Sequence, residues 1–453
     1  MVIIGGGISG LATAFFLSTV GIRSTIVEKS SRLGGLIATR SVSGCQLEAG
    51  PDSYLASKPA VTELARELGD LETQIIGSND QRRRIFVVRS GRLIPMPRGL
   101  VMIAPSQWIP ALSSDLFSCR TKLRFVTETF AVPRQRFNDV PVSELVLDHF
   151  GHEVLRYVAE PLLAGVYGGD SANLSAQSVL PRFMDYERRY GSLIKGVRQE
   201  RRSSPAGSMF LSFRHGMQSL TDALLQAITG STEIVHAEAT NLKRAGNGWQ
   251  ARIGDEFIAA DHIVLACPAY ASAKLLQTAG PALADELAAI PYSSAILATL
   301  VYHRSSVGQP LNGFGFLVPR SERRTISAAT CISAKFPSRV PEDFTAFRGF
   351  IVDPEASPLL SASEDRITQL VHADFESLMH LQSTPVFASV HFWPNSMPQY
   401  VVGHRQRRST VGALAHEITG LHLVGNAYDG VGIPDCVALA KETATRIARA
   451  VNT

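Results

Sequence analysis

The chain has few cysteines, and their spacing fits neither a disulfide framework nor a zinc site. Its 453 residues include five cysteines, at positions 45, 119, 267, 331 and 436, without a CxxC pair. Disulfide scaffolds usually carry dense, even sets of cysteines, and structural zinc sites carry closely spaced ligand pairs. We therefore expect reduced thiols, a cytoplasmic location and no metal.

Membrane-spanning segments and strongly basic blocks are also missing. The apolar, uncharged stretch 99–114 is shorter than the roughly 20 residues of a spanning helix, and Pro105 and Pro110 interrupt it. No signal peptide is expected, because the chain begins on an apolar run typical of a strand. The net charge is only +4, and the nearest approach to a basic block is Arg82-Arg83-Arg84. No nucleic-acid partner is therefore expected.

The N-terminus, in contrast, carries a nucleotide-binding pattern. A buried strand is predicted at 1–4, a helix at 8–20 and a second strand at 24–27 that leads into Glu28. Gly5, Gly7 and Gly10 lie between the first strand and the helix in G-x-G-x-x-G spacing. These glycines allow a tight turn, close approach of a pyrophosphate and close packing of the helix, while the acid accepts hydrogen bonds from ribose. A glycine turn without a nucleotide is the alternative.

Two further segments specify the nucleotide. Residues 28–35, EKSSRLGG, and residues 47–53, LEAGPDS, resemble the flavin-contacting segments of the amine oxidase superfamily. This resemblance implies FAD, held without a covalent bond because 426–433 offers no cysteine or histidine. The implied FAD-binding residues are Gly5, Gly6, Gly7, Ile8, Ser9, Gly10, Glu28, Arg32, Gly35, Leu36, Gly50, Pro51, Asp52, Ser53, Ala239, Gly425, Val431, Gly432 and Ile433.

Three internal strings resemble a narrower group, the oxygen-dependent porphyrinogen oxidases. They are EPLLAGVYGGD at 160–170, AKFP at 334–337, and MPQY at 397–400 followed by Gly403-His404. Glycines in the first string would let backbone approach a flat substrate, since they lack Cβ. A helix C-cap and turn is the alternative explanation for the same glycines.

The resemblance implies an α/β fold with three parts. Residues 1–82, 201–270 and 418–453 would form a discontinuous Rossmann-type FAD-binding domain. Residues 83–94 and 271–417 would form an antiparallel-sheet substrate domain. Residues 95–200, whose apolar residues recur at helical spacing, would form a helical membrane-associating domain.

The implied activity is oxidation of protoporphyrinogen IX to protoporphyrin IX in heme biosynthesis. Hydride would leave a methylene bridge for the flavin in three rounds, and O2 would reoxidise the cofactor with release of hydrogen peroxide. Coproporphyrinogen III oxidation is the main alternative. A flavin amine oxidase, a carotenoid desaturase and a non-catalytic FAD-binding protein are more distant ones. A ferrochelatase acting on the product and a homodimeric state are also implied.

Three residues are candidates for contact with the substrate. Arg84 is placed like the family's carboxylate-binding arginine, with Arg83 as the alternative, and Gly165 and Phe336 lie in the family strings. An arginine suits this role because its planar fork pairs with a carboxylate bidentately. His149, His215, His391 and His404 are scattered, and each is interpreted as a surface or hydrogen-bonded core histidine.

The segment 95–117 allows two interpretations. It combines Leu100, Met102, Ile103 and Trp108 with Arg98, a composition typical of a peripheral contact at the inner face of the cell membrane. The same side chains could instead line an apolar substrate cavity. Both interpretations stay open at this point.

Overall fold

The glycine-rich N-terminus forms the centre of a parallel sheet in a computed structural model that describes residues 1–201, 207–307 and 311–451. The chain divides into two compact units, of which the first comprises Met1–Ser78, Met209–Pro291 and Gln406–Thr453. Its main sheet has five strands in the order β12-β2-β1-β16-β22, all parallel. These strands are β1 Val2–Ile4, β2 Ser24–Glu28, β12 Thr232–His236, β16 Ile263–Leu265 and β22 Leu421–Leu423.

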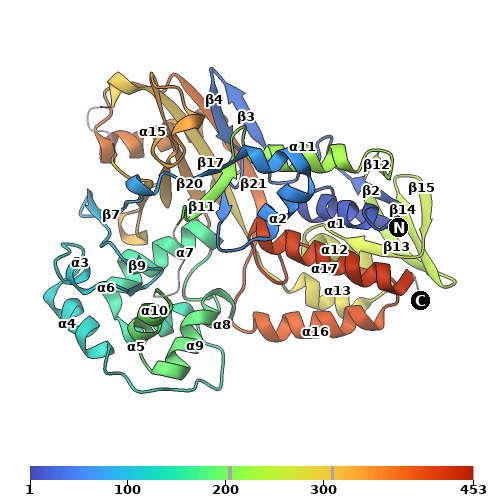
Figure 1. Ribbon diagram of the computed structural model, residues 1–453, viewed down its shortest axis with the longest axis horizontal. Helices are drawn as coiled ribbons and strands as arrows, with labels where there is room; N and C mark the ends of the chain where they lie inside the picture. Colours follow the sequence, from blue (N-terminus) through green and yellow to red (C-terminus); the bar gives the residue numbers. More distant parts are fainter. Residues whose placement is uncertain (202–206, 308–310, 452–453) are drawn as a thin grey trace. The chain divides into compact units, whose positions relative to one another are not determined.

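Two helices from opposite ends of the chain pack together on this sheet. Helix α1 Ile8–Ser18 is almost wholly apolar, and helix α17 Ile433–Val451 buries residues three or four positions apart. Figure 1 shows them side by side, in blue and red. Because their apolar faces share one core with β1, the first and last segments of the chain build a single nucleotide-binding unit, as the sequence predicts.

Smaller elements complete the first unit. They are the hairpin β3 Thr39–Val42 and β4 Cys45–Glu48, the sheet β5 Tyr54–Leu55, β11 Phe210–Phe213 and β6 Ile75–Gly77, the meander β13 Ala239–Ala245, β14 Gly248–Ile253 and β15 Glu256–Ala260, and the helices α2 Ala60–Glu67, α11 Gln218–Ala227, α12 Ala269–Leu276, α13 Pro281–Ala288 and α16 His404–Glu417. Asp261 and His262 separate β15 from β16, which belong to different sheets.

The second unit, Asn79–Ser208 and Tyr292–Arg405, is built on a seven-stranded sheet. Its order is β21-β17-β20-β19-β18-β7-β8, and all neighbours are antiparallel except β18 and β7. The expected antiparallel sheet is therefore mixed. Its strands are β7 Ile85–Arg89, β8 Arg92–Pro95, β17 Tyr292–His303, β18 Gly315–Leu317, β19 Ala328–Cys331, β20 Phe344–Val352 and β21 Phe387–Pro398.

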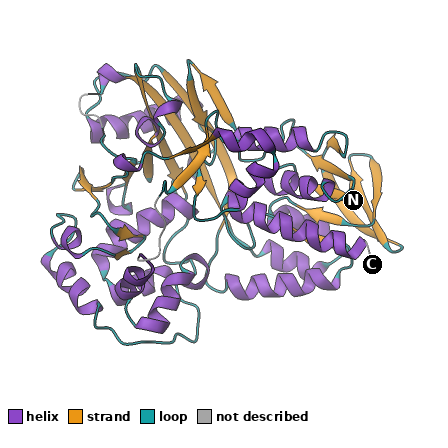
Figure 2. Ribbon diagram, viewed as in Figure 1, coloured by secondary structure: helices purple, strands orange, loops and turns teal. Residues whose placement is uncertain are grey.

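Helix α15 Glu364–Met379 covers one face of this sheet. It buries Ile367, Val371, Phe375 and Met379, which recur every four residues and pack against the core of the sheet. Figure 2 separates the strands of this sheet, in orange, from the helices, in purple. Residues 100–201 are mostly helical, as predicted. Their elements are β9 Leu100–Val101, β10 Ala104–Pro105, α3 Trp108–Leu112, α4 Cys119–Glu128, α5 Val142–His149, α6 His152–Val154, a π-helical turn Leu155–Ala159, α7 Glu160–Tyr167, α8 Ala176–Val179, α9 Pro181–Tyr190 and α10 Leu193–Arg201.

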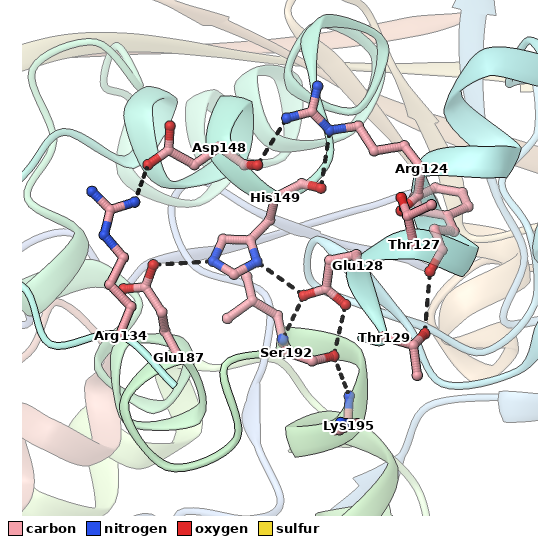
Figure 3. Close-up of polar contacts among 12 residues, drawn as sticks. Arg124, Thr127, Glu128, Thr129, Arg134, Asp148, His149, Glu187, Ser192 and Lys195 are labelled. Carbon is pink, nitrogen blue, oxygen red and sulfur yellow. Dashed lines mark hydrogen bonds and ion pairs between the residues drawn. The ribbon is translucent and has the colours of Figure 1, made fainter. Parts of the chain in front are cut away.

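A buried network of charges holds these helices together (Figure 3). The His149 ring is sandwiched between two carboxylates, with Nδ1 2.9 Å from Glu128 Oε1 and Nε2 3.1 Å from Glu187 Oε1. Glu128 also accepts hydrogen bonds from Ser192 Oγ and Leu193 N. The interpretation of His149 as a hydrogen-bonded core histidine is confirmed.

The residues that suggested a membrane contact are covered to different degrees. Ile103 is fully buried, and Leu100 and Met102 are half-buried. The Arg198 guanidinium lies over Trp108, 5.7 Å from the centroid of the Trp108 ring. The exposed large apolar residues of the helical part are others: Val101, Ile109, Leu112, Leu123, Val126, Phe130, Val132, Phe137 and Val166. Among the described residues, no helix combines the length and hydropathy needed to cross a bilayer.

The two compact units differ from the predicted division at its boundaries. Residues 271–291 and 406–417 group with the nucleotide-binding unit, because α12 packs on α13 and on the β13 meander. The helical residues 95–200 and the large sheet share the second unit. The further division of that unit by function, into a substrate sheet and a membrane-associating part, stays a prediction.

Candidate flavin and substrate sites

The turn between β1 and α1 can be built only from glycine at two of its three motif positions. Gly5 has φ +112°, and a Cβ at Gly10 would lie 2.0 Å from the Gly5 carbonyl oxygen. At Gly7, by contrast, the atom nearest to an added Cβ would be 3.9 Å away. Gly5 and Gly10 thus serve the packing of the helix on the strand, and Gly7 leaves room beside the turn.

The N-terminus of α1 is suited to an anion. No side chain caps it, and no acidic residue lies in its first turn. The unpaired N–H groups and the positive end of the helix dipole favour a phosphate there. Gly6, Ile8 and Ser9, the other predicted residues of this turn, lie at the same place, with Gly6 and Ser9 buried.

Glu28 ends the second strand and holds the glycine turn. Its Oε2 accepts a hydrogen bond from Gly6 N at 2.7 Å, and its Oε1 accepts from Ser30 N at 2.9 Å and Ser30 Oγ at 2.8 Å. A carboxylate offers about four acceptor sites, so these bonds leave capacity for a ribose hydroxyl. Glu28 therefore also stabilises the glycine turn, a role that the sequence pattern does not reveal.

The segment after Glu28 is clamped by an arginine. The Arg32 guanidinium donates to the carbonyls of Leu33, at 2.9 Å, and Ile37, at 2.8 Å, and also to that of Gly35. The resulting loop packs on the glycine turn, because Gly34 N donates to Gly6 O. The predicted residues Gly35 and Leu36 thus lie beside the turn.

The second predicted flavin loop packs on the first. A Cβ at Gly50 would lie 2.0 Å from the Leu36 carbonyl oxygen, so only glycine fits there. Pro51, Asp52 and Ser53 are half-buried, and Ser212 Oγ donates to the Asp52 carbonyl at 2.6 Å. Ala239, by contrast, opens the β13 meander and is part-exposed.

The C-terminal loop brings a second helix N-terminus to the same edge of the sheet. Gly425 has φ +139°, and the loop through Val431 and Gly432 leads into α17 at Ile433. The two helix starts are adjacent, since the Cys436 thiol hydrogen-bonds the Ser9 side chain. Glycine turns and helix N-termini therefore converge within one unit.

This arrangement fits an FAD molecule. The backbone N–H groups of α1 and the room at Gly7 suit a pyrophosphate, Glu28 suits a ribose, and the start of α17 offers backbone groups to a flavin ring. Which of these residues touch the cofactor stays a prediction.

Of the two candidate arginines of the second unit, Arg84 is the one without a side-chain partner among the described residues. Arg83 pairs with Asp80 at 3.3 Å. Arg84 is half-buried at the start of β7, and its carbonyl accepts from Phe314 N, which fixes its backbone beside β18. An arginine with a fixed backbone and an unpaired guanidinium group is suited to bind a carboxylate.

Gly165 lies on α7 with space around it. A Cβ there would meet only Ala328 and Leu317, at 3.9 and 4.0 Å. Gly168, with φ +59°, is the left-handed C-cap of α7. The C-cap alternative is therefore confirmed for Gly168, whereas the helix geometry does not require a glycine at position 165.

Phe336 is buried, with an exposed fraction of 1%. The Lys335 ammonium lies 5.4 Å and the Arg339 guanidinium 5.0 Å from its ring centroid, and both side chains are buried as well. In this conformation the ring contacts protein cations. Contact between Phe336 and a substrate stays a prediction.

Comparison with known proteins identifies the family. The model for flavin containing amine oxidoreductases matches residues 8–448. The chain belongs to this family. FAD is accordingly its cofactor, and the α/β fold matches that of the family.

Three relatives cover nearly the whole flavoenzyme chain. It is 31% identical to the coproporphyrinogen III oxidase of Bacillus subtilis (strain 168), covering 97% of this chain and 96% of the relative. It is 28% identical to a chloroplastic protoporphyrinogen oxidase of Nicotiana tabacum, covering 98% and 85%. A structure from Exiguobacterium sp. 255-15, provisionally named a protoporphyrinogen oxidase, is 29% identical over 99% and 98%, with a TM-score of 0.88. The resemblance to porphyrinogen oxidases is thus confirmed.

The sequence did not lead us to predict the hydrogen bonds and the ion pair that hold the start of α17 in this flavoenzyme. Asp435 Oδ2 accepts from Gly432 N at 3.3 Å, and both carboxylate oxygens lie 2.7 Å from Lys58 Nζ. An acid three residues after an N-cap is half of a capping box, a signal that the string GIPD carries. Lys58 lies 377 positions away, so no local pattern could have found it.

Cys436 is the cysteine nearest in sequence to the 425–432 loop. Burial raises the pKa of its thiol to about 11, which keeps it protonated and weakly nucleophilic. This environment favours FAD held without a covalent bond, which remains a prediction.

Proposed function

We propose that this flavoenzyme oxidises a porphyrinogen to the corresponding porphyrin in heme biosynthesis, with O2 as the electron acceptor. The observation that carries the proposal is the near full-length similarity to two named porphyrinogen oxidases, with 97% and 98% of this chain covered. The bound flavin would supply the redox chemistry by accepting hydride from a substrate carbon and passing electrons to O2. Removal of six hydrogens would consume three O2 and release three hydrogen peroxide.

The sequence resemblance implied protoporphyrinogen IX as the substrate. We now favour coproporphyrinogen III. The identity to the Bacillus coproporphyrinogen III oxidase, 31%, exceeds that to the tobacco protoporphyrinogen oxidase, 28%. Protoporphyrinogen IX is the second candidate, which the tobacco and Exiguobacterium proteins support.

The chain's own residues would bind and orient this substrate. Arg84 would pair with a propionate. The half-exposed Gly165 would let the ring lie close to α7, and Phe336 with its two cations would form a further wall. Holding the reacting carbon at a fixed distance from the cofactor supplies much of the rate in reactions of this kind.

Turnover of the two porphyrinogens distinguishes the alternatives. Porphyrin fluorescence should appear with either substrate, and kcat/KM should be at least about tenfold higher for coproporphyrinogen III, because tenfold corresponds to the roughly 1.4 kcal/mol of one lost contact. A preference for protoporphyrinogen IX would assign the other reaction. If anaerobic mixing with either substrate leaves the flavin oxidised, the protein is a non-catalytic FAD carrier.

Arg84 and its neighbour Arg83 give a matched pair of variants, because only Arg83 has a side-chain partner among the described residues. Arg84→Ala should raise KM, with a loss of about 1.5–3 kcal/mol for a charge-assisted pair. Arg83→Ala should leave KM unchanged, because Arg83 already pairs with Asp80. If only Arg83→Ala raises KM, the propionate anchor is Arg83.

We also propose a peripheral membrane contact through the exposed apolar residues of the helical part rather than through Trp108. Phe130, Val132 and Phe137 are 77%, 77% and 91% exposed, and Arg134 lies among them. Flotation with anionic liposomes, weakened by salt, is the expected result. Protein that stays at the bottom of the gradient would contradict the contact.

A further inference from the structure

Helix α7 carries Gly165 and lies across several strands of the large sheet. Ala164, the neighbour of Gly165, packs with Ala295 of β17, Val352 of β20 and Met397 of β21. At its N-terminal end, Glu160 accepts a hydrogen bond from Arg320 N. The position of Gly165 therefore depends on how both ends of this short helix are held.

A buried glutamine side chain holds the C-terminal end. Gln399, 8% exposed, places its Nε2 with two N–H groups 2.8 Å from the Tyr167 carbonyl, 2.8 Å from Ser293 Oγ and 3.0 Å from the Met397 carbonyl, so three acceptors share its two hydrogens. Two of these partners are carbonyls, which can only accept. The amide must therefore present its NH2 group to them, and its orientation is fixed by the partners.

The other side of the same amide lies against the turn that follows α7. A Cβ at Gly169 would be 2.1 Å from Gln399 Oε1. Gly168 is similarly close, since a Cβ there would be 2.8 Å from the Met397 sulfur and 3.0 Å from Ser293 Oγ. The glycines of the 160–170 string thus allow the turn to close over Gln399.

We propose that Gln399 is a positioning residue for substrate binding: it locks the C-terminal end of α7 to β17 and β21 and so fixes Gly165. The inference rests on the proposed function, in which Gly165 faces the porphyrinogen. It assigns a role to the glutamine of the 397–400 string and explains why position 169 is a glycine.

The contact can be broken from either side. Gln399→Glu replaces the NH2 donor by oxygens that repel two carbonyls, and Gly169→Ala pushes the amide aside. Each variant should raise KM, and the Kd of the product porphyrin measured by fluorescence quenching, about tenfold, because a displaced α7 loses part of its contact with the porphyrin ring. The kcat should stay within about twofold, and flavin content should stay normal. Gln277→Glu, at an exposed glutamine, should change nothing.

The double variant tests whether the two residues act through one contact. Because either change alone releases the end of α7, the double variant should bind porphyrin about as weakly as the single ones, not about a hundredfold more weakly. Additive effects, or a lower melting temperature with unchanged Kd and KM, would overturn the inference. Gln399→Met, which keeps the shape without charge, replaces Gln399→Glu if that variant does not fold.

Failure of the proposed function gives a different result. A wild-type protein that binds porphyrin but oxidises no porphyrinogen would contradict the function, while weaker porphyrin binding by the variants would still support the role of Gln399. A wild-type protein that turns over substrate, with variants that match it, would contradict only the role of Gln399.

Discussion

The predicted flavin-binding turns close through backbone contacts at glycines, with hydrogen bonds to Glu28 and from Arg32, whereas the helical part of the second unit is held by buried charged side chains. At the turns, Gly10 contacts the Gly5 carbonyl and Gly50 contacts that of Leu36, so close approach leaves no room for side chains. In the helical part, by contrast, Glu128, His149 and Glu187 are all nearly inaccessible to solvent. The glycine turns leave backbone N–H groups that can bind an anion. In the helical part, the charged side chains pair with one another.

The charge balance of the helical part follows from its hydrogen bonds. Carboxylates only accept, and both nitrogens of His149 face one, so the ring is doubly protonated. Arg136, whose side chain is 4% exposed, pairs with Glu187 and also with Asp148 and Glu144. Two buried cations thus offset two buried carboxylates. The buried part of this network is neutral, but it is destabilised by the loss of any member.

Removal of His149 should have the largest effect. His149→Gln would leave Glu128 and Glu187 facing each other without a cation between them, at a cost of about 3–5 kcal/mol in the free energy of unfolding. The second unit should melt earlier, as measured by calorimetry and by hydrogen exchange in α4, α5 and α9. Flavin content should be unchanged, because the cofactor residues lie in the other unit. The exposed neighbour His152 provides the control variant, His152→Gln.

Loss of flavin together with the early melting would contradict the separation of the two regions. It would indicate that the charge network also supports the cofactor site. A melting temperature equal to that of the control would instead show that His149 carries no net charge in the folded protein.

Substitution of Glu28 should weaken the cofactor site itself. Glu28→Ala removes the acceptor of Gly6 N and a candidate ribose ligand, so FAD affinity should fall by about 1.5–3 kcal/mol, or tenfold to hundredfold. The measurement is fluorescence titration of the apoprotein with FAD. Glu28→Gln, which keeps one acceptor, should lose less. Undiminished affinity in Glu28→Ala would remove Glu28 from the site.

The difference between the two regions also explains what could be predicted from sequence. The glycine turn is local: strand, glycines, helix and Glu28 lie within the first 28 residues, so spacing alone predicted them. The partners of His149 lie 21 and 38 positions away, and no pattern brings them together. The contact between Trp108 and Arg198 is likewise not visible in a local pattern, because the two residues are distant in sequence.

The substrate residues fall between these extremes. Gly168 as a helix C-cap follows from local sequence, Arg84 was suggested by its position relative to the family's arginine, and Phe336 lies in a family string. Their contacts are close in sequence, since Arg83 pairs with Asp80 and both cations over Phe336 come from its own segment, but the sequence alone does not show which of these contacts form. Sequence can therefore suggest such residues as candidates for substrate contact. Whether their side chains are accessible to a substrate depends on the fold.

The last two glycines of the motif provide a smaller and sharper test of the backbone-built turn. Gly10→Ala would place a Cβ 2.0 Å from a carbonyl oxygen, so overpacking should cost about 1–3 kcal/mol of stability. Gly7→Ala meets no atom nearer than 3.9 Å and should keep the melting temperature of the apoprotein while lowering FAD affinity. Equal loss of apoprotein stability in both variants would show that Gly7 also serves packing and not the cofactor.

The smallest expected effect is the pH dependence of the charge network. Hydrogen bonds and charge attraction from Glu128 and Glu187 outweigh burial and raise the pKa of His149, so its stabilisation is present below its unfolded pKa and is lost as pH rises through the folded value. The pKa of Glu187 is lowered to about 2 by His149 and Arg136 despite its burial, so its contribution is present above the ordinary carboxyl pKa and is lost as pH falls toward 2.

The second unit should therefore be most stable in mildly acidic solution. Between the ordinary histidine pKa and the raised folded pKa of His149, the free energy of unfolding should fall by up to about 1.4 kcal/mol for each pH unit and then level off. Calorimetry from mildly acidic to alkaline pH measures this slope, and His149→Gln should abolish it while lowering stability throughout. The backbone contacts of the glycine turn do not titrate, so FAD affinity should stay constant over the same range. A parallel decline of FAD affinity in the wild-type protein, absent from His149→Gln, would show that the network and the cofactor site are coupled after all.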